Sequence, residues 1–162
     1  MSAEPLNFVE FTVDDEDRFA ALCAIFAALK HDKDAGVFRE DADWLKFFDE
    51  EALSHFWWPT QAERAAEMAR WQAASPEQRL SDPALSPPAW DFGSLFAAFE
   101  NGEYALVACR RVGAGRARLE FETHSYPYGG TGCMHALIGA FGFRVVAEDD
   151  GTGCYVYTPA ET

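Results

Sequence analysis

Apolar residues recur with helical spacing between residues 14 and 30 and define one face of a predicted helix. That face consists of Phe19, Leu22, Cys23, Phe26 and Leu29. Acidic side chains crowd the start of the segment, at residues 14–17, where the helix dipole favours negative charge. Gly36 provides an exit turn, so we expect a well-defined first helix.

The aromatic and aliphatic side chains of residues 41–56 predict one or two further helical turns. Thr60 and Glu63 have the spacing of a capping box, which predicts that a helix of about residues 61–74 begins there. The apolar positions of that helix, expected to face the core, are Ala65, Met68, Ala69 and Trp71.

Proline dominates the next segment, residues 75–91, which contains Pro76, Pro83, Pro87 and Pro88. Because proline donates no backbone hydrogen bond and restricts the residue before it, we expect a loop. A loop of this length inside a compact domain is usually functional or mobile. We take it as the connection between a helical first half and a β-rich second half.

Turn residues and apolar runs predict strands in the second half of the chain. Asn101-Gly102 lies between two apolar runs and favours a hairpin, and Asp150-Gly151 favours another near the end. Residues 117–124 alternate between apolar and polar positions, which indicates a strand with one buried face. Residues 132–141 predict a helix, and residues 6–13 predict a short strand at the start of the chain.

These elements indicate an α+β fold, in which a helical N-terminal half precedes an antiparallel sheet of about five strands with one helix inserted between hairpins. We expect a single domain over residues 1–162, since this length suits one core. Its helical part covers about 14–74, the Pro-rich connection 75–91 and the β-rich part about 92–158.

Charge narrows the choice of partners. Lys and Arg total 13 against 27 Asp and Glu, a net charge of −14. Such a surface repels a phosphate backbone, so we expect no nucleic-acid partner and, if any protein partner, a basic one. One basic tip interrupts the acidic surface, formed by Arg110, Arg111, Arg116 and Arg118.

Cysteine usage and hydropathy point to a cytoplasmic protein without cofactors. Cys23, Cys109, Cys133 and Cys154 are far apart in sequence and show neither metal-ligand spacing nor a disulfide framework. The first residues lack the pattern of a signal peptide. The longest apolar run, residues 19–29, is too short to cross a membrane, so we expect no membrane association.

A glycine-rich stretch before the predicted helix at 132–141 is the candidate ligand site. Its members are Tyr126, Tyr128, Gly129, Gly130, Thr131 and Gly132. The free amides and the dipole of a helix start can bind an anion and can lower the pKa of a thiol, here Cys133. His124 lies close enough in sequence to act as the base for a Cys133 nucleophile.

Structural explanations compete with this hypothesis. The stretch matches neither the dinucleotide fingerprint nor the P-loop. Its glycines can serve only to relieve backbone crowding, and a free cysteine is commonly a small buried hydrophobe. Trp57 and Trp58 pose a similar choice, between core packing and anchoring an interface.

Two classes of function are therefore consistent with the sequence. One is an acidic protein-interaction module, such as an inhibitor or immunity-type protein that neutralises a basic partner. The other is a domain that binds a small molecule or an anion, or an enzyme, with its site at Tyr126–Cys133. The charge and the absence of a catalytic motif favour the first.

Overall fold

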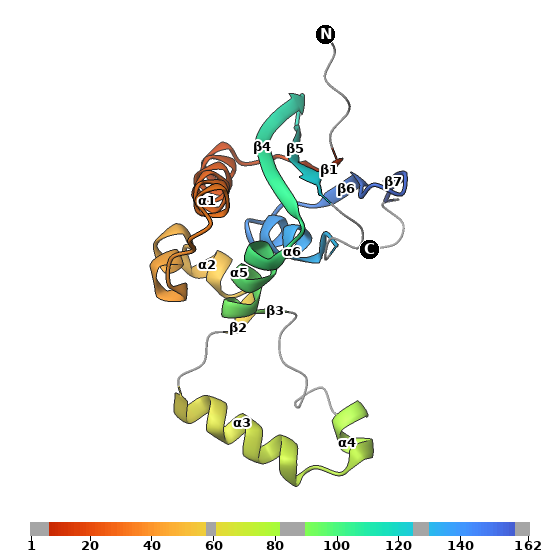
Figure 1. The fold of residues 1–162 in the computed structure, drawn as a ribbon. Helices are drawn as coiled ribbons and strands as arrows, with labels where there is room; N and C mark the ends of the chain where they lie inside the picture. Colours follow the sequence, from red (N-terminus) through yellow and green to blue (C-terminus); the bar gives the residue numbers. More distant parts are fainter. Residues whose placement is uncertain (1–6, 58–60, 82–89, 125–129, 158–162) are drawn as a thin grey trace.

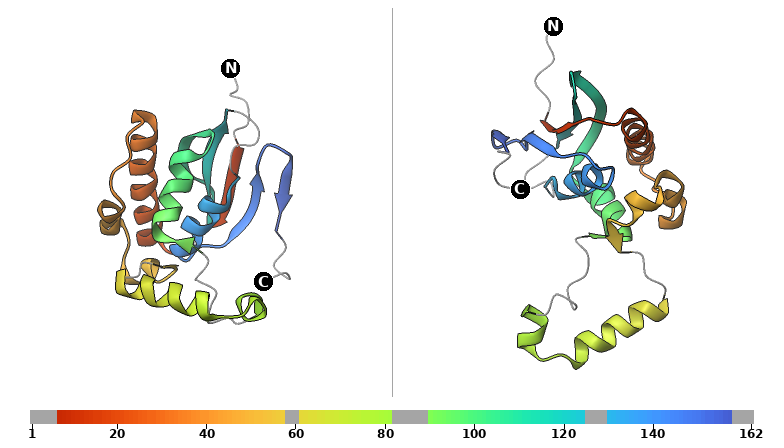
Figure 2. Two further views of the ribbon diagram at one scale, coloured as in Figure 1. Left: turned by 60° about the horizontal axis from the view of Figure 1, so that its bottom comes forward. Right: turned by 180° about the vertical axis from the view of Figure 1, so that it is seen from behind.

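The computed structural model describes residues 7–57, 61–81, 90–124 and 130–157 and confirms the α+β class. Its main sheet is antiparallel and has the strand order β4-β5-β1-β6-β7. The bounds are β1 Asn7–Thr12, β4 Tyr104–Gly113, β5 Arg116–Thr123, β6 Val145–Asp149 and β7 Cys154–Val156. Figures 1 and 2 show helices gathered on one side of this sheet.

Strand β1 has a more central place than the sequence indicated. It pairs with β5 on one side, through Val9 opposite Leu119, and with β6 on the other, through Val9 opposite Glu148. The strand predicted at residues 6–13 is therefore present, and the structure adds its place in the sheet between β5 and β6. A short strand gives no signal of its partners, because partner choice depends on contacts distant in sequence.

Helix α1 (Glu16–Ala35) confirms the first predicted helix. Asp15 caps it by accepting a hydrogen bond from the amide of Arg18 at 3.1 Å. At the other end, Gly36 adopts φ 75°, the left-handed conformation that glycine tolerates. The helix continues beyond residue 30, and Asp32 in its last turns is buried and bound by Arg39 at 2.9 Å.

The predicted turns at 41–56 are the 3-10 helix η1 (Asp41–Phe47) and helix α2 (Glu50–Leu53). Trp44 of η1 is fully buried and stacks on Phe96, with ring centroids 4.7 Å apart. The Arg39 guanidinium lies over the Trp44 indole, 4.7 Å from the centre of the ring. This aromatic stack attaches η1 to the rest of the core.

The hairpin predicted around Asn101-Gly102 is wrong, because residues 92–101 form helix α5 (Phe92–Asn101). Its buried side chains Phe92, Leu95, Phe96 and Phe99 follow a helical period. Asp91 caps the helix through the Ser94 amide at 3.0 Å. Gly102 has φ −64°, not the positive value of the expected turn, so the Asn-Gly pair marks the end of a helix.

The Pro-rich connection also contains regular structure. Ser75 and Gln78 form a reciprocal capping box, with hydrogen bonds of 2.9 and 3.2 Å, and Pro76 begins helix α4 (Pro76–Ser81). Strand β3 (Trp90–Asp91) pairs in parallel with β2 (Phe56–Trp57). Residues 82–89 lie outside the described part of the chain.

Helix α3 (Gln61–Ala73) and helix α4 form what we call the arm, residues 61–81. Figures 1 and 2 show it apart from the body, by which we mean the other described residues. Every side chain of α3 that the structure describes is exposed, including Ala65, Met68, Ala69 and Trp71. The prediction that these positions face the core is therefore wrong.

The sheet face opposite the helices is charged, and its arginines have acidic partners. Glu10 binds Arg118 at 2.8 Å and Arg116 at 3.1 Å, and Glu120 binds Arg110 at 2.8 Å. On the side of the helices, Arg111 pairs with Glu16 at the start of α1. The basic tip predicted from the sequence is thus neutralised by neighbouring carboxylates.

Candidate functional site

The described part of the glycine-rich stretch leads into helix α6 (Gly132–Ala140). Tyr126, Tyr128 and Gly129 lie outside the described residues. Gly130 is exposed and has φ 81°, a conformation that favours glycine. Gly132 lies against the indole of Trp90: a Cβ there would meet a ring carbon at 3.3 Å. Both glycines therefore have a structural reason for their positions.

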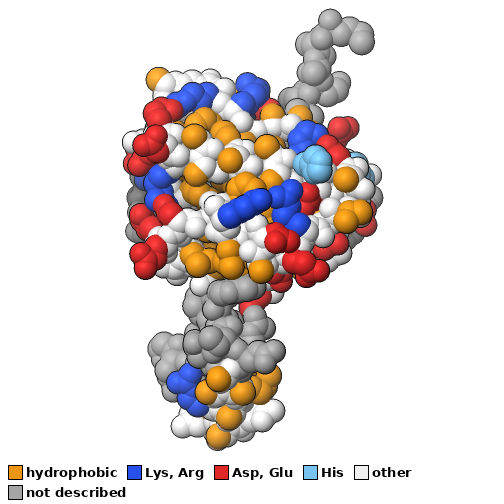
Figure 3. Space-filling model, turned by 90° about the vertical axis from the view of Figure 1, so that its left-hand side faces the viewer, with side chains coloured by type: hydrophobic (Ala, Val, Ile, Leu, Met, Phe, Trp, Pro, Cys, Tyr) orange, Lys and Arg blue, Asp and Glu red, His pale blue; other side chains and the backbone are white. Residues whose placement is uncertain are grey.

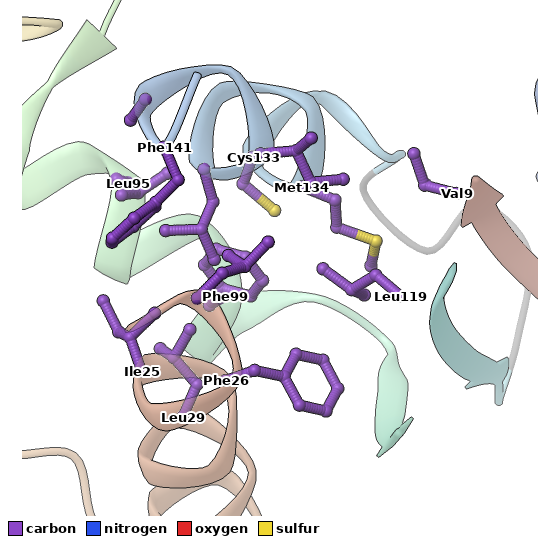
Figure 4. Close-up of a cluster of buried hydrophobic side chains, with 14 of the residues drawn as sticks. Val9, Ile25, Phe26, Leu29, Leu95, Phe99, Leu119, Cys133, Met134 and Phe141 are labelled. Carbon is purple, nitrogen blue, oxygen red and sulfur yellow. The ribbon is translucent and has the colours of Figure 1, made fainter. Parts of the chain in front are cut away.

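Cys133 points into the hydrophobic core from the first turn of α6 (Figure 4). It is 4% exposed, and its sulfur lies 3.4 Å from the hydroxyl of Tyr104. The Lys33 ammonium lies 4.7 Å from the centre of the Tyr104 ring and donates to the carbonyl of Phe99 at 2.6 Å. Burial raises the pKa of the Cys133 thiol, although the Tyr104 hydrogen bond opposes this effect.

His124 lies in a different environment. It follows the last residue of β5, is exposed, and uses its backbone amide to donate to the carbonyl of Glu103 at 2.9 Å. Neither a hydrogen bond nor an ion pair joins the described side chains of His124 and Cys133. A buried thiol with a raised pKa, out of contact with its proposed base, lacks the features of an activated nucleophile.

A polar cluster that the sequence analysis missed lies on the outer side of the same helix start. Its centre is Glu148 of β6, which is 8% exposed. One carboxylate oxygen accepts a hydrogen bond from the Thr131 hydroxyl at 2.8 Å and also lies 2.8 Å from His135 Nε2. The other oxygen accepts from the Tyr157 hydroxyl at 2.6 Å. The rings of His135 and Tyr157 meet edge to face, with centroids 5.9 Å apart.

These contacts shift the pKa values of two groups in the cluster, Glu148 and Tyr157. Burial alone would raise the pKa of Glu148, but hydrogen bonds from His135, Tyr157 and Thr131 outweigh it and hold the pKa below its usual range. Burial and the neighbouring Glu148 carboxylate raise the pKa of Tyr157 to about 12. The cluster therefore contains an ionised carboxylate and a neutral phenol at neutral pH.

This carboxylate changes what the helix start can bind. Glu148 accepts the hydroxyl of Thr131, the residue that precedes α6, so a negative charge already lies at the positive end of the helix. An incoming anion would meet electrostatic repulsion there. The arrangement instead holds β6, α6 and the residue after β7 together.

The sequence contained a weak signal for this cluster. Thr131 and His135 are four residues apart, so they share one face of a helix. Glu148 lies directly opposite Val9 of β1, and residues directly opposite one another in paired strands share a face of the sheet, here the face of the core. That pairing is the part of the geometry that the sequence did not predict.

The side chains of the two tryptophans predicted as interface anchors lie outside the described part of the chain. Trp58 lies outside the described residues, and so does the side chain of Trp57, whose backbone pairs with Asp91. Large exposed hydrophobic side chains occur instead on the arm. Met68 is 56% exposed, Trp71 45% and Leu80 92%.

The fold and these sites define an α+β protein with a buried thiol, a carboxylate-centred polar cluster and an exposed helical arm. Among the described residues, no group of three or more His, Cys, Asp or Glu could hold a metal ion. No described helix is long and apolar enough to cross a membrane. Comparisons with protein-family models, curated proteins and solved structures give no match to this chain.

Cys133 should react slowly with thiol reagents because it is buried. Brief alkylation of the folded chain at neutral pH, read by peptide mass spectrometry, should label the exposed Cys154 and leave Cys133 unlabelled. His124→Ala should leave the rate at Cys133 unchanged. Labelling of Cys133 as fast as Cys154, slowed by His124→Ala, would restore the nucleophile hypothesis.

Glu148→Gln should destabilise the protein by about 1–3 kcal/mol at neutral pH, because the three donors lose a charged acceptor. A lowered folded pKa contributes stability above the ordinary pKa of the carboxyl and loses it as the pH falls through the folded value. Urea unfolding should therefore show a difference from wild type that narrows below about pH 4. A difference independent of pH, or an equal effect of the exposed control Glu122→Gln, would contradict this role.

Proposed function

We propose that this chain is a protein-interaction module that binds a basic partner protein, and that the arm enters an apolar groove on that partner. The main support is that α3 exposes every side chain described for it, including large apolar ones. Exposed apolar surface of this kind is typical of interaction sites. Figure 3 shows hydrophobic side chains gathered on the arm below the body.

The length of the helix strengthens this argument. Helix α3 has 13 residues, and isolated helices of that length are marginal in water. Most helices of globular proteins gain their stability by burying an apolar face, which α3 does not do within this chain. A partner that covers Met68 and Trp71 would supply the missing burial.

The arm is already shaped for binding. Arg79 of α4 donates to the carbonyls of Trp71 and Gln72, at 2.9 and 3.2 Å, at the end of α3. Its guanidinium also lies 4.0 Å from the centre of the Trp71 ring. These contacts fix the angle between the helices and hold the indole in place, which lowers the entropy lost on binding.

Charge indicates the chemistry of the partner. The arm carries as many acidic as basic residues, whereas the whole chain has a charge of −14. On the body, Arg18 brings together an acidic patch: its side chain binds Asp49 at 3.0 Å and Glu51 at 3.2 Å, and its amide donates to Asp15. These three carboxylates are exposed, as are Asp14, Asp17 and Glu50, which lie close to them in sequence. A partner with a basic rim would complement this patch, and a second copy of the chain would be repelled.

Binding of this kind suits an inhibitor or immunity-type protein, which acts by covering its target and requires no catalytic group of its own. The buried Cys133 and the internally satisfied Glu148 are consistent with that mode of action. Electrostatic attraction would speed the encounter, and the apolar arm would slow the dissociation.

The arm can be tested with the combined variant Met68→Ser, Trp71→Ser, Leu80→Ser. The full chain should retain a basic protein from a lysate of its own source, and the purified pair should bind by calorimetry. The arm variant should weaken that binding by at least about thirtyfold, since a central Trp typically contributes 2 kcal/mol or more. Its circular dichroism should still show the folded body, because the substituted side chains are exposed.

A matched control replaces exposed apolar residues of the body, in the variant Val37→Ser, Tyr155→Ser, Val156→Ser. This control should bind the basic protein as wild type does, and raised salt should weaken all three complexes. Equal binding by the arm variant would contradict the proposal. So would a wild-type dimer in sedimentation that the arm variant dissociates, because the arm would then serve self-association.

A further inference from the structure

Two cysteines that are distant in sequence lie side by side in the structure. Cys23 of α1 and Cys109 of β4 are 86 residues apart, yet their sulfur atoms are 3.8 Å from each other. The Cys23 sulfur also lies 3.7 Å from the backbone carbonyl of Cys109. The sequence spacing did not indicate this contact, and in the structure both cysteines are free thiols.

We propose that Cys23 and Cys109 form a reversible disulfide when the protein meets a hydroperoxide, with Cys23 as the attacking thiol. The two sulfur atoms lie 3.8 Å apart, and a disulfide requires about 2.05 Å. Rotation of the side chains about their Cα–Cβ bonds can supply this approach. Neither residue is fully buried, so an oxidant as small as hydrogen peroxide can reach the pair.

The surroundings distinguish the roles of the two thiols. The hydrogen bond with Cys109 and the positive charge of Arg111 lower the pKa of Cys23 to about 7, although burial opposes this shift. The same hydrogen bond and burial raise the pKa of Cys109. At neutral pH, Cys23 therefore supplies the thiolate, and Cys109 retains its proton and lies ready as the second thiol.

The chemistry balances in two steps. The Cys23 thiolate attacks one peroxide oxygen, the O–O bond breaks, and a sulfenic acid and hydroxide form. The Cys109 sulfur then attacks the Cys23 sulfur, so that an S–S bond replaces the S–O bond. The departing hydroxide takes the Cys109 proton and leaves as water. The hydroxide from the first step takes up the proton that Cys23 released on ionising, so over both steps two thiols and one hydrogen peroxide give one disulfide and two waters.

The other cysteines serve as internal comparisons. Cys133 is buried and Cys154 is exposed. Cys133 is therefore shielded from the oxidant, and Cys154 can react only alone or with another molecule. The proposal concerns α1 and β4 and does not depend on the arm or on any partner.

The test uses the full chain with Cys154→Ser, which removes intermolecular disulfides. After reduction, it is treated with hydrogen peroxide, and the remaining thiols are alkylated after denaturation. Peptide mass spectrometry should find the Cys23 peptide linked to the Cys109 peptide, and dithiothreitol should reverse the link. The oxidised chain should unfold at a temperature higher by roughly 5–10 °C, because a long loop is closed.

Single variants separate the steps. Cys109→Ser should stop at a sulfenic acid on Cys23 that dimedone traps, and Cys23→Ser should slow the loss of thiols by about tenfold or more. Both variants should lack the linked peptide. The proposal is overturned if the folded protein yields no linked peptide while Cys23 and Cys109 stay alkylatable, or if the link forms only after denaturation.

Discussion

The insertion of β1 between β5 and β6 is the constraint on which the rest of the structure depends. Without it, β4-β5 and β6-β7 would be separate hairpins, and a single hairpin is marginally stable in water. With it, Val9 and Phe11 join the same core as side chains from α1, α5 and α6. The same pairing turns Glu148 toward Thr131 and His135, so the polar cluster is also a consequence of where β1 lies.

This arrangement leaves one part of the chain without a place in the core. Helices α1, α5 and α6 cover the sheet, and the aromatic stack of Trp44 on Phe96 adds η1 to them. The arm leaves the body between β2 and β3 and exposes its apolar residues. Because the described side chains of α3 bury no apolar face in this chain, a surface on a partner would supply that burial, as the proposed function requires.

The sequence predicted many of the helices, strands and turns from local patterns, but it predicted few of the contacts between residues far apart in the chain. The acids and Gly36 that frame α1, the alternation of residues 117–124 and the turn at Asp150-Gly151 all indicated elements that are present. The Asn101-Gly102 pair misled, because the helical spacing of Phe92, Leu95 and Phe99 outweighs a turn signal. Sequence spacing gave no hint that Cys23 meets Cys109, or that Met68 and Trp71 lie outside the core, since both depend on tertiary packing.

The central claim is that the body folds around β1 and that the arm is not part of that fold. Amide hydrogen exchange of the full chain, measured by mass spectrometry at neutral pH, tests it most directly. The account predicts that residues 7–12 exchange among the slowest, together with β5, and that residues 61–73 exchange at least about a hundredfold faster. If α3 were as protected as β1, the arm would be packed within the protein, and its apolar side chains would not be available to a partner.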